Sequence, residues 1–132
     1  MNLIVCVDDH LGMVFHHRRQ SRDRVLCQHL LKLAENSRML VSPSSALLFE
    51  NQDVAIDPDF LQNARQDDWC FGEEPPFLPF EDRIQKLAVC RWNRVYPADQ
   101  FLDLNLQNWV LLSREEFPGS SHDLITLEVY SK

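Results

Sequence analysis

The sequence predicts an α/β fold built on a mostly parallel β-sheet that closes with antiparallel strands at its C-terminal end. Short apolar runs with the composition of buried strands alternate with helix-like segments through residues 1–92. Two strand-like runs, 109–113 and 124–130, then follow each other without an intervening helix, as antiparallel neighbours do. No repeat or linker interrupts the 132 residues, so we expect one domain over residues 1–132.

The first half of the chain supplies two strands and two helices. Residues 3–7 are apolar and partly β-branched, which indicates a buried strand. Ser21 is a suitable N-cap for an amphipathic helix, and Pro43 suits the first turn of a second, shorter helix. The elements expected here are a strand over 3–7, a polar loop over 14–20, a helix over 22–35, a strand over 38–41 and a short helix over 44–50.

The second half of the chain continues this alternation before it reaches the closing strands. Residues 51–59 are rich in Asn, Asp and Pro and predict a loop, in which Asp57 and Pro58 favour the start of a helix. The elements expected after this loop are a helix to about Ala64, a strand over 69–71, a Pro-rich segment over 73–84 that becomes amphipathic towards Ile84, a strand over 86–92 and the two closing strands.

Composition and charge exclude several classes of protein. The formal net charge is −7, so broad binding to nucleic acid is disfavoured. The apolar runs are far too short to cross a bilayer, and the N-terminus lacks the basic stretch of a signal peptide, so we expect a cytoplasmic protein without membrane association. The four cysteines form no C-x-x-C pair, which favours reduced core residues over zinc ligands.

One basic run stands out against the acidic background. His16, His17, Arg18 and Arg19 could bind phosphate or RNA, and the two imidazoles could act as an acid–base pair on a ribose 2′-hydroxyl. The alternative is a solvated loop that precedes the first helix.

Two other clusters favour structural over chemical roles. Asp8, Asp9 and His10 are adjacent, and neighbouring side chains on an extended segment point to opposite faces, so a turn is favoured and no metal site is expected. His122 follows two serines in a short loop, but the sequence shows no third group that would orient it as a catalytic base. A catalytic role for His122 is therefore disfavoured.

Several motifs together resemble the dihydrofolate reductase family. The chain reads LIVCVDDHLGM at 3–13, WCFG at 69–72, KLAVCRWNRVYPADQF at 86–101 and QNWVLLSREEFPGSSHDLITLEVY at 107–130. Their order and spacing, over most of the chain, carry the resemblance. It implies a three-layer α/β sandwich of reduced length, with a mostly parallel mixed sheet and antiparallel C-terminal strands. It also implies a helix over 77–84 and a structural turn at His122.

The resemblance also implies a ligand cleft between the first strand and the first helix. Asp23 matches the acidic residue that binds the pterin ring in this family and assists its protonation, a role that a raised pKa would favour. The alternative is an ionised residue in the first helical turn, beside Arg22 and Arg24. Gly72 matches a glycine of the cofactor site. The residues implied to line the cleft are Val5, Cys6, Asp23, Cys27 and Cys90.

The chain departs from the family at its cofactor-binding positions. Glu73, Glu74 and two prolines follow Gly72, so carboxylates would repel a pyrophosphate and backbone N–H donors are lost. Residues 42–45 read SPSS where the family has Gly-Arg-x-Thr, whose Arg pairs with the 2′-phosphate of NADPH. We therefore expect no cofactor, with NADPH bound only if the altered site keeps affinity for it.

Three functions remain open from the sequence. The first is a non-reductase protein that binds a small molecule or a protein partner in the residual cleft. The second is an oxidoreductase that uses NADPH to reduce a pterin-like substrate. The third is an RNA- or phosphate-binding or RNA-processing protein that uses residues 16–19, with ribonuclease chemistry the less favoured form. The short segment between the second and central strands could also leave a sheet edge that pairs in a homodimer.

Overall fold

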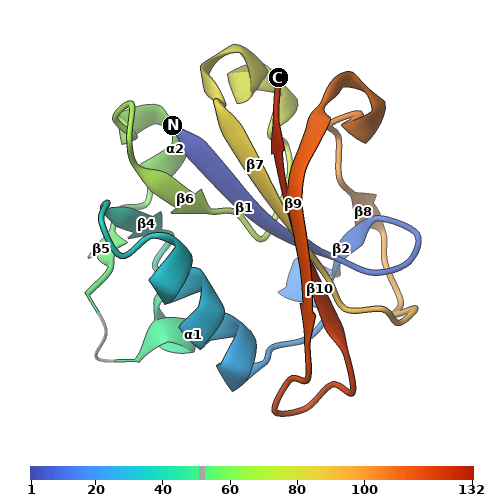
Figure 1. Cartoon of the computed structure of the whole chain (residues 1–132). Coiled ribbons are helices and arrows are strands. Elements are labelled where there is room, and N and C mark those ends of the chain that lie inside the picture. The colour runs from blue at the N-terminus through green and yellow to red at the C-terminus, as the bar shows by residue number, and fades with distance from the viewer. Residues whose placement is uncertain (51–52) are drawn as a thin grey trace.

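A seven-stranded sheet of order β5-β4-β6-β1-β7-β10-β9 dominates the computed structural model, which describes residues 1–50 and 53–132 (Figure 1). Its strands are β1 (Asn2–Val7), β4 (Met39–Val41), β5 (Ala55–Ile56), β6 (Trp69–Phe71), β7 (Lys86–Arg91), β9 (Val110–Phe117) and β10 (Ile125–Ser131). The first five of these run parallel, whereas β10 is antiparallel to both β7 and β9. The predicted class, an α/β sheet with antiparallel C-terminal strands, is confirmed.

Smaller elements cover the two faces of this sheet. A three-stranded sheet of order β3-β2-β8 contains β2 (Gly12–Phe15), β3 (Arg18–Arg19) and β8 (Gln100–Phe101). The α-helices are α1 (Arg24–Leu33) and α2 (Phe60–Asn63), and the 3₁₀ helices are η1 (Ala46–Phe49), η2 (Leu78–Arg83) and η3 (Leu106–Asn108).

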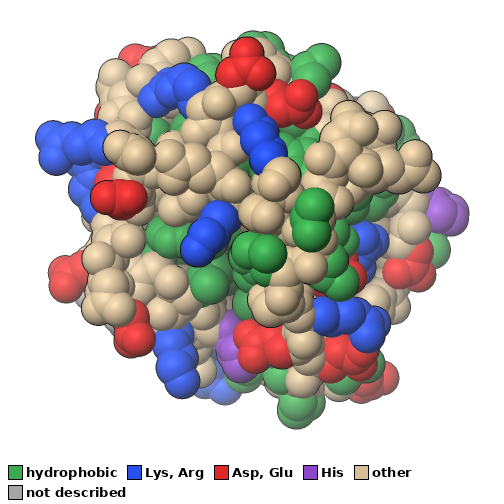
Figure 2. All heavy atoms as spheres, turned by 45° about the horizontal axis from the view of Figure 1, so that its top comes forward, with side chains coloured by type: hydrophobic (Ala, Val, Ile, Leu, Met, Phe, Trp, Pro, Cys, Tyr) green, Lys and Arg blue, Asp and Glu red, His purple; other side chains and the backbone are tan. Residues whose placement is uncertain are grey.

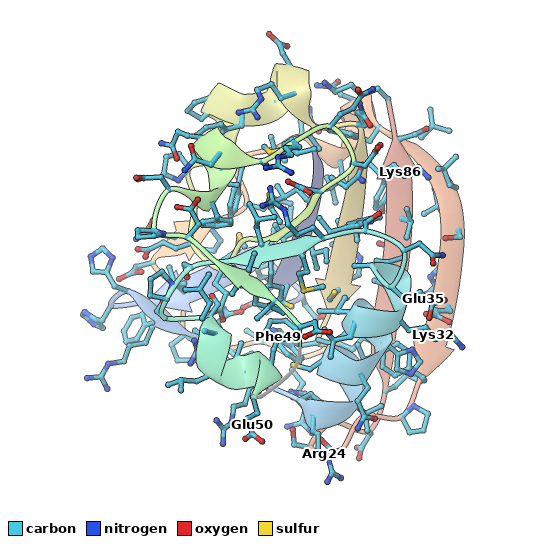
Figure 3. All side chains as sticks on the ribbon, turned by 90° about the vertical axis from the view of Figure 1, so that its left-hand side faces the viewer. Arg24, Lys32, Glu35, Phe49, Glu50 and Lys86 are labelled. Atoms are coloured by element: carbon cyan, nitrogen blue, oxygen red, sulfur yellow. The ribbon has the colours of Figure 1, made fainter. Side chains whose placement is uncertain are left out.

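The alternation of side chains along β1 divides the interior into two cores. Ile4 packs with Leu26 and Leu30 of α1 on one face, whereas Leu3 and Val5 pack on the other. Figure 3 shows α1 lying beside the sheet, with Arg24 at its N-terminal end and Lys32 near its C-terminal end. The sheet is thus the middle of three layers, as a dihydrofolate reductase-like sandwich requires.

The structure corrects two local predictions before α1. Asp23, not Ser21, is the N-cap, because its carboxylate accepts the N–H of Leu26 and the helix begins at Arg24. Residues 14–20 do not form a loop: β2 and β3 pair as a hairpin whose tip is His16 and His17. Both tip residues have positive φ (51° and 62°), a conformation that a two-residue hairpin turn usually takes from Asn or Gly.

The predicted short helices are present but shorter than expected. Residues 44–50 and 77–84 contain the 3₁₀ helices η1 and η2 in place of α-helices, and α2 covers only four residues. The predicted loop 51–59 contains β5, and its residues 51 and 52 lie outside the described residues. Packing against the sheet fixes these short segments, because so few residues cannot sustain an isolated helix.

The two edges of the large sheet differ in length. The shortened middle of the chain is capped by the two-residue strand β5, so the long edge is β9 at the other side. Val110, Leu111 and Leu112 on β9 are 58%, 47% and 54% exposed. An exposed apolar edge of this length suits pairing with another strand, and the homodimer stays a prediction.

Charged side chains are spread over the surface. Figure 2 shows positive and negative groups interspersed over most of the face in view. Within the described residues, no helix is both long enough and apolar enough to span a bilayer.

Candidate functional site

Asp23 joins the N-terminus of α1 to the loop between β9 and β10. Its Oδ1 accepts hydrogen bonds from the N–H groups of Leu26 (3.1 Å) and Ser120 (3.0 Å). Its Oδ2 accepts from the N–H (2.9 Å) and hydroxyl (3.2 Å) of Ser121 and from Nδ1 of His122 (2.9 Å). The side chain is 0% exposed, so five donors surround a carboxylate that has no contact with solvent.

The pKa of this carboxylate distinguishes between the two interpretations of Asp23 drawn from the sequence. Burial alone would raise the pKa of Asp23, but hydrogen bonds from Ser121, His122, Ser120 and Leu26 outweigh burial and hold this pKa well below its ordinary value of 3.8. The expectation of a raised pKa is therefore wrong, whereas the alternative of an ionised residue agrees with the lowered pKa. Asp23 is a buried, ionised acceptor.

Gly119 permits the close approach of the loop to Asp23. A Cβ atom at Gly119 would lie 2.3 Å from Oδ2 of Asp23, closer than any real contact. The N–H of Gly119 also donates to the carbonyl of His122 at 2.9 Å, which closes the turn. The turn aims the following N–H groups at the carboxylate.

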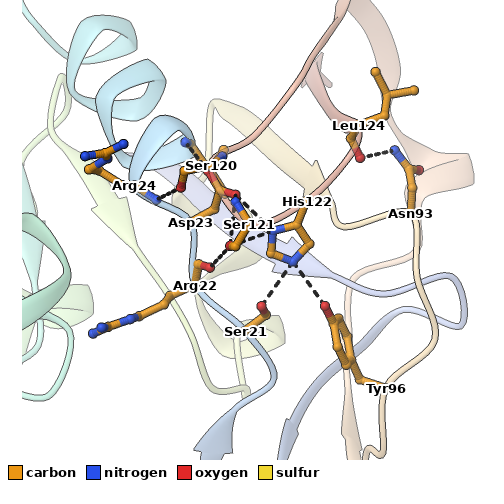
Figure 4. A network of polar contacts seen from close by, with 11 residues as sticks. Ser21, Arg22, Asp23, Arg24, Asn93, Tyr96, Ser120, Ser121, His122 and Leu124 are labelled. Atoms are coloured by element: carbon orange, nitrogen blue, oxygen red, sulfur yellow. Dashed lines mark hydrogen bonds and ion pairs between the residues drawn. The ribbon is translucent and has the colours of Figure 1, made fainter.

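His122 connects Asp23 to two hydroxyl groups from other parts of the chain (Figure 4). Its Nε2 lies 3.1 Å from Oγ of Ser21 and 3.0 Å from the hydroxyl of Tyr96. Its ring stacks on Trp92 with centroids 4.5 Å apart, and its side chain is 1% exposed. The sequence suggested only a turn residue, because its partners Ser21, Asp23 and Tyr96 are far from it along the chain.

The cleft implied between β1 and α1 is closed. Cys6, Asp23 and Cys27 line a cavity of about 20 Å³, room for about one water molecule. Val5 does not line this cavity, because it points to the opposite core from Cys6. Cys90 is fully buried beside Cys6 in the β1–β7 register and does not line it either.

The four cysteines are free thiols in an apolar interior. Burial raises the pKa of Cys27 to about 11 and that of Cys70 to about 12. A hydrogen bond with Cys90, together with burial, raises the pKa of Cys6. The expected core position is confirmed for Cys27, Cys70 and Cys90, and the raised pKa values of Cys6, Cys27 and Cys70 suppress the reactive thiolate.

We expect these thiols to resist a water-soluble disulfide reagent in the folded protein. At pH 8, native protein should react with 5,5′-dithiobis(2-nitrobenzoic acid) at least about 100-fold more slowly than protein in guanidinium chloride, because both burial and protonation oppose attack. The measurement is the absorbance of released thionitrobenzoate over time. Fast release of one equivalent from native protein would show that Cys6, the only half-buried one among the four, is an accessible thiolate.

In this structure, close packing against Phe77 explains why position 72 is a glycine. A Cβ atom at this position would lie 2.5 Å from Cε1 of Phe77, whose ring is 1% exposed. Glu73 follows directly and accepts hydrogen bonds from Nε (2.8 Å) and Nη2 (2.9 Å) of Arg19 and from Oγ of Ser45 (2.6 Å). A half-buried ion pair therefore occupies the segment that resembles the cofactor loop.

The basic run 16–19 is partly neutralised by acidic neighbours. His17 pairs with Glu74, a hydrogen bond and charge that raise the pKa of His17. The N–H of His16 donates to Asp99 at 3.1 Å. Arg19 pairs with Glu73, whereas the side chains of His16 and Arg18 form no ion pair in the described part of the chain. The RNA alternative thus has less positive charge to use than the sequence suggested.

The turn at Asp8 is structural, as predicted. Oδ1 of Asp8 accepts the N–H groups of His10 and Gly12 at 2.8 Å, and Oδ2 accepts from Gln20 and from the N–H of Tyr96. No group of three or more metal-ligating side chains occurs among the residues that the structure describes.

A groove of about 630 Å³ lies next to the closed cavity, because Arg19 and Glu73 line both spaces. It lies at the carboxyl ends of β4 and β6, because Ser42 follows β4 and Glu73 follows β6. The residues that line this polar groove are Val14, His17, Arg18, Arg19, Ser42, Ser44, Phe60, Leu61, Glu73, Glu74 and Pro75. Arg19 and Glu73 also line the closed cavity, so their ion pair separates the two spaces.

Comparisons with known proteins define the class of fold. The structure matches a dihydrofolate reductase from Enterococcus faecalis, solved in complex with NADP(H) and RAB-propyl, with a TM-score of 0.65 and 7% sequence identity. The match covers 98% of this chain and 95% of that enzyme. The chain therefore has a dihydrofolate reductase-like fold. No family model matches the sequence, and no curated protein matches it either.

Proposed function

We propose that this protein is not a reductase and that it binds a small polar ligand in the polar groove. The observation that carries the proposal is Glu73. Its carboxylate is held by Arg19 and Ser45 at the end of β6, so the Arg19–Glu73 pair stands between the small cavity beside Asp23 and the polar groove. In open α/β sheets, ligands bind in crevices outside the carboxyl ends of the strands, which is where this groove lies.

The size and charge of the groove define the class of ligand. Its volume of about 630 Å³ is in the range of small-molecule sites. Two arginines and two glutamates line it, so its formal charges cancel when His17 is neutral. A compact ligand with both donors and acceptors suits this lining, whereas a pyrophosphate would meet the carboxylates of Glu73 and Glu74.

Binding of a pterin at Asp23 has less support than binding in the groove. Both carboxylate oxygens of Asp23 already accept protein hydrogen bonds, so a pterin would have to displace several of these donors. The inner cavity also has room for about one water molecule. A reductase on this scaffold requires both the cavity and the Arg19–Glu73 pair to open.

The first test of this proposal is an NADPH titration followed by tryptophan fluorescence. Trp69 lies on β6, three residues before Gly72, and should report on ligands in this region. We expect no saturable quenching at micromolar NADPH, with or without methotrexate, while circular dichroism shows a folded protein. Saturable quenching would contradict the proposal and favour the reductase.

A second test asks whether the groove binds anything. We expect at least one compound from a panel of amino acids, nucleosides and monosaccharides to raise the melting temperature of wild-type protein, because ligands of the native state stabilise it. Ser44→Trp should remove this shift, because the exposed Ser44 lines the groove and an indole would fill it. The matched variant Ser113→Trp, on exposed β9, should keep it. A shift retained in Ser44→Trp would place the ligand elsewhere.

A further inference from the structure

We propose that Ser21, His122 and Asp23 form a nucleophilic triad that hydrolyses small esters carrying a negative charge. The three residues meet at the N-terminus of α1, on the side of Asp23 that faces the β9–β10 loop. This site is independent of a ligand in the polar groove. It uses residues that the resemblance to dihydrofolate reductase did not bring together.

The geometry has the order that a serine nucleophile requires. Oδ2 of Asp23 lies 2.9 Å from Nδ1 of His122, and Nε2 of the same ring lies 3.1 Å from Oγ of Ser21. An ionised Asp23 accepts a hydrogen bond from the Nδ1–H of His122, which leaves the lone pair of Nε2 directed at the serine hydroxyl. Stacking on Trp92 fixes the plane of the imidazole. Each group is thus within hydrogen-bonding distance of the next.

Ser21 is accessible from an open basin on the surface. This arginine basin has a volume of about 630 Å³ and is lined by Arg19, Ser21, Arg22, Asp23, Arg24, Ser120 and Ser121. Ser21 is half-buried, whereas Asp23 and His122 behind it are buried. The nucleophile therefore faces solvent, and the base and its orienting carboxylate are shielded from it.

The basin determines the class of substrate. Arg22 and Arg24 are exposed and form no ion pair within the described residues, so their charges can meet a carboxylate or phosphate on the substrate. Positive charge near Ser21 also favours the negative charge that develops on the carbonyl oxygen during attack. A small anionic ester fits both requirements.

The reaction needs only the ester and water. The hydroxyl proton of Ser21 passes to Nε2 of His122 while Oγ bonds to the ester carbonyl carbon. The bond from that carbon to the leaving alkoxy oxygen then breaks, and Nε2 returns the proton to the departing alcohol. Water attacks the acyl-serine by the same path, which releases the carboxylic acid and restores Ser21.

Tyr96 provides an internal check on this assignment. Its hydroxyl also lies 3.0 Å from Nε2, where it competes with Ser21 for one lone pair. Tyr96→Phe should therefore raise the rate at which Ser21 reacts, because Nε2 is left with a single hydroxyl donor. A lower rate would mean that the histidine acts with Tyr96 and would overturn the assignment.

The decisive experiment is covalent labelling with a fluorophosphonate, which reacts with activated serines. We expect one adduct per chain on Ser21 by peptide mass spectrometry, at a rate at least about 100-fold above that of Ser21→Ala. Ser113→Ala, on exposed β9, should label like wild type, and protein in guanidinium chloride should not label. No adduct on native protein, or an adduct on another serine, would overturn the proposal. His122→Gln should lose labelling while circular dichroism confirms its fold; if that variant unfolds, Ser21→Ala decides alone.

The class of substrate has its own test. Wild-type protein should hydrolyse the 4-nitrophenyl monoester of succinic acid with a kcat/KM about tenfold above that for 4-nitrophenyl acetate, because only the first carries a carboxylate. Arg22→Gln combined with Arg24→Gln should remove the preference, because kcat/KM for the succinate ester should fall further than kcat/KM for the acetate. Equal kcat/KM values for both esters in wild type would overturn the assignment to anionic substrates.

Discussion

Asp23→Ala is expected to lower the free energy of unfolding by about 3–5 kcal/mol, because it leaves buried hydrogen-bond donors without their acceptor. The substitution removes the N-cap of α1 and the acceptor of Ser120, Ser121 and His122 at once. Asp23→Asn keeps one carbonyl oxygen but turns an amide towards these donors, so we expect a loss of about 2 kcal/mol. Urea titration followed by circular dichroism measures both variants.

Asp123 provides a matched control for this prediction. It lies in the same loop but is exposed, so Asp123→Asn should change the free energy of unfolding by less than about 0.5 kcal/mol. A loss below about 1 kcal/mol for Asp23→Ala would show that the loop and helix are held by other contacts.

The depressed pKa of Asp23 also predicts the direction of acid sensitivity. A carboxyl whose pKa is lower in the folded than in the unfolded state stabilises the fold fully above the unfolded value, ordinarily 3.8. That stability is lost as the pH falls from there towards the folded pKa. Wild-type protein should therefore become less stable below about pH 4 with a steeper dependence than Asp23→Asn, measured as urea midpoints at several pH values.

Gly72→Ala is expected to cost about 2–3 kcal/mol of unfolding free energy through overpacking. The new Cβ would lie 2.5 Å and 2.8 Å from two ring atoms of Phe77 and 3.2 Å from Cδ1 of Leu3. Both neighbours are at most 1% exposed, so neither can move aside without disturbing the core. The loss is measured by the same urea titration.

A double-mutant cycle with Phe77→Leu identifies the cause of this loss. Leucine lacks the ring atoms that meet the new Cβ, so Gly72→Ala should cost at least about 1 kcal/mol less in the Phe77→Leu background. Additive effects, or a Gly72→Ala variant as stable as wild type, would show that the position has room. That result would favour the interpretation that Gly72 leaves room for a bound nucleotide.

Together these two positions bear on how far the resemblance to dihydrofolate reductase extends. The resemblance in sequence assigns Asp23 and Gly72 to the pterin and cofactor sites, yet in this structure one anchors a loop and the other accommodates a buried ring. The fold is that of dihydrofolate reductase, whereas the contacts at both positions serve the fold itself. This is the physical basis for proposing a non-reductase, since function resides in the site and not in the scaffold.

The strands and turns that depend only on neighbouring residues could be predicted from the amino-acid sequence. The apolar runs at 3–7, 69–71 and 86–92 predicted the buried strands β1, β6 and β7, because strands buried on both faces require continuous apolar residues. The two runs at the C-terminal end predicted the antiparallel pair in the same way. The predicted turn at Asp8 was also correct, because Asp accepts hydrogen bonds from N–H groups a few residues away.

The β2–β3 hairpin and the polar contacts of the candidate site depend on tertiary structure. The β2–β3 hairpin was missed because His16 and His17 adopt positive φ without the Asn or Gly that would signal it, and pairing of β2 with β8 supports it from outside. Asp23 and His122 are 99 residues apart, and Arg19 and Glu73 are 54 apart. Periodicity along a chain reports how each segment is buried, but it does not encode which distant polar groups meet. The order of the strands and the path of the β9–β10 loop bring these groups together.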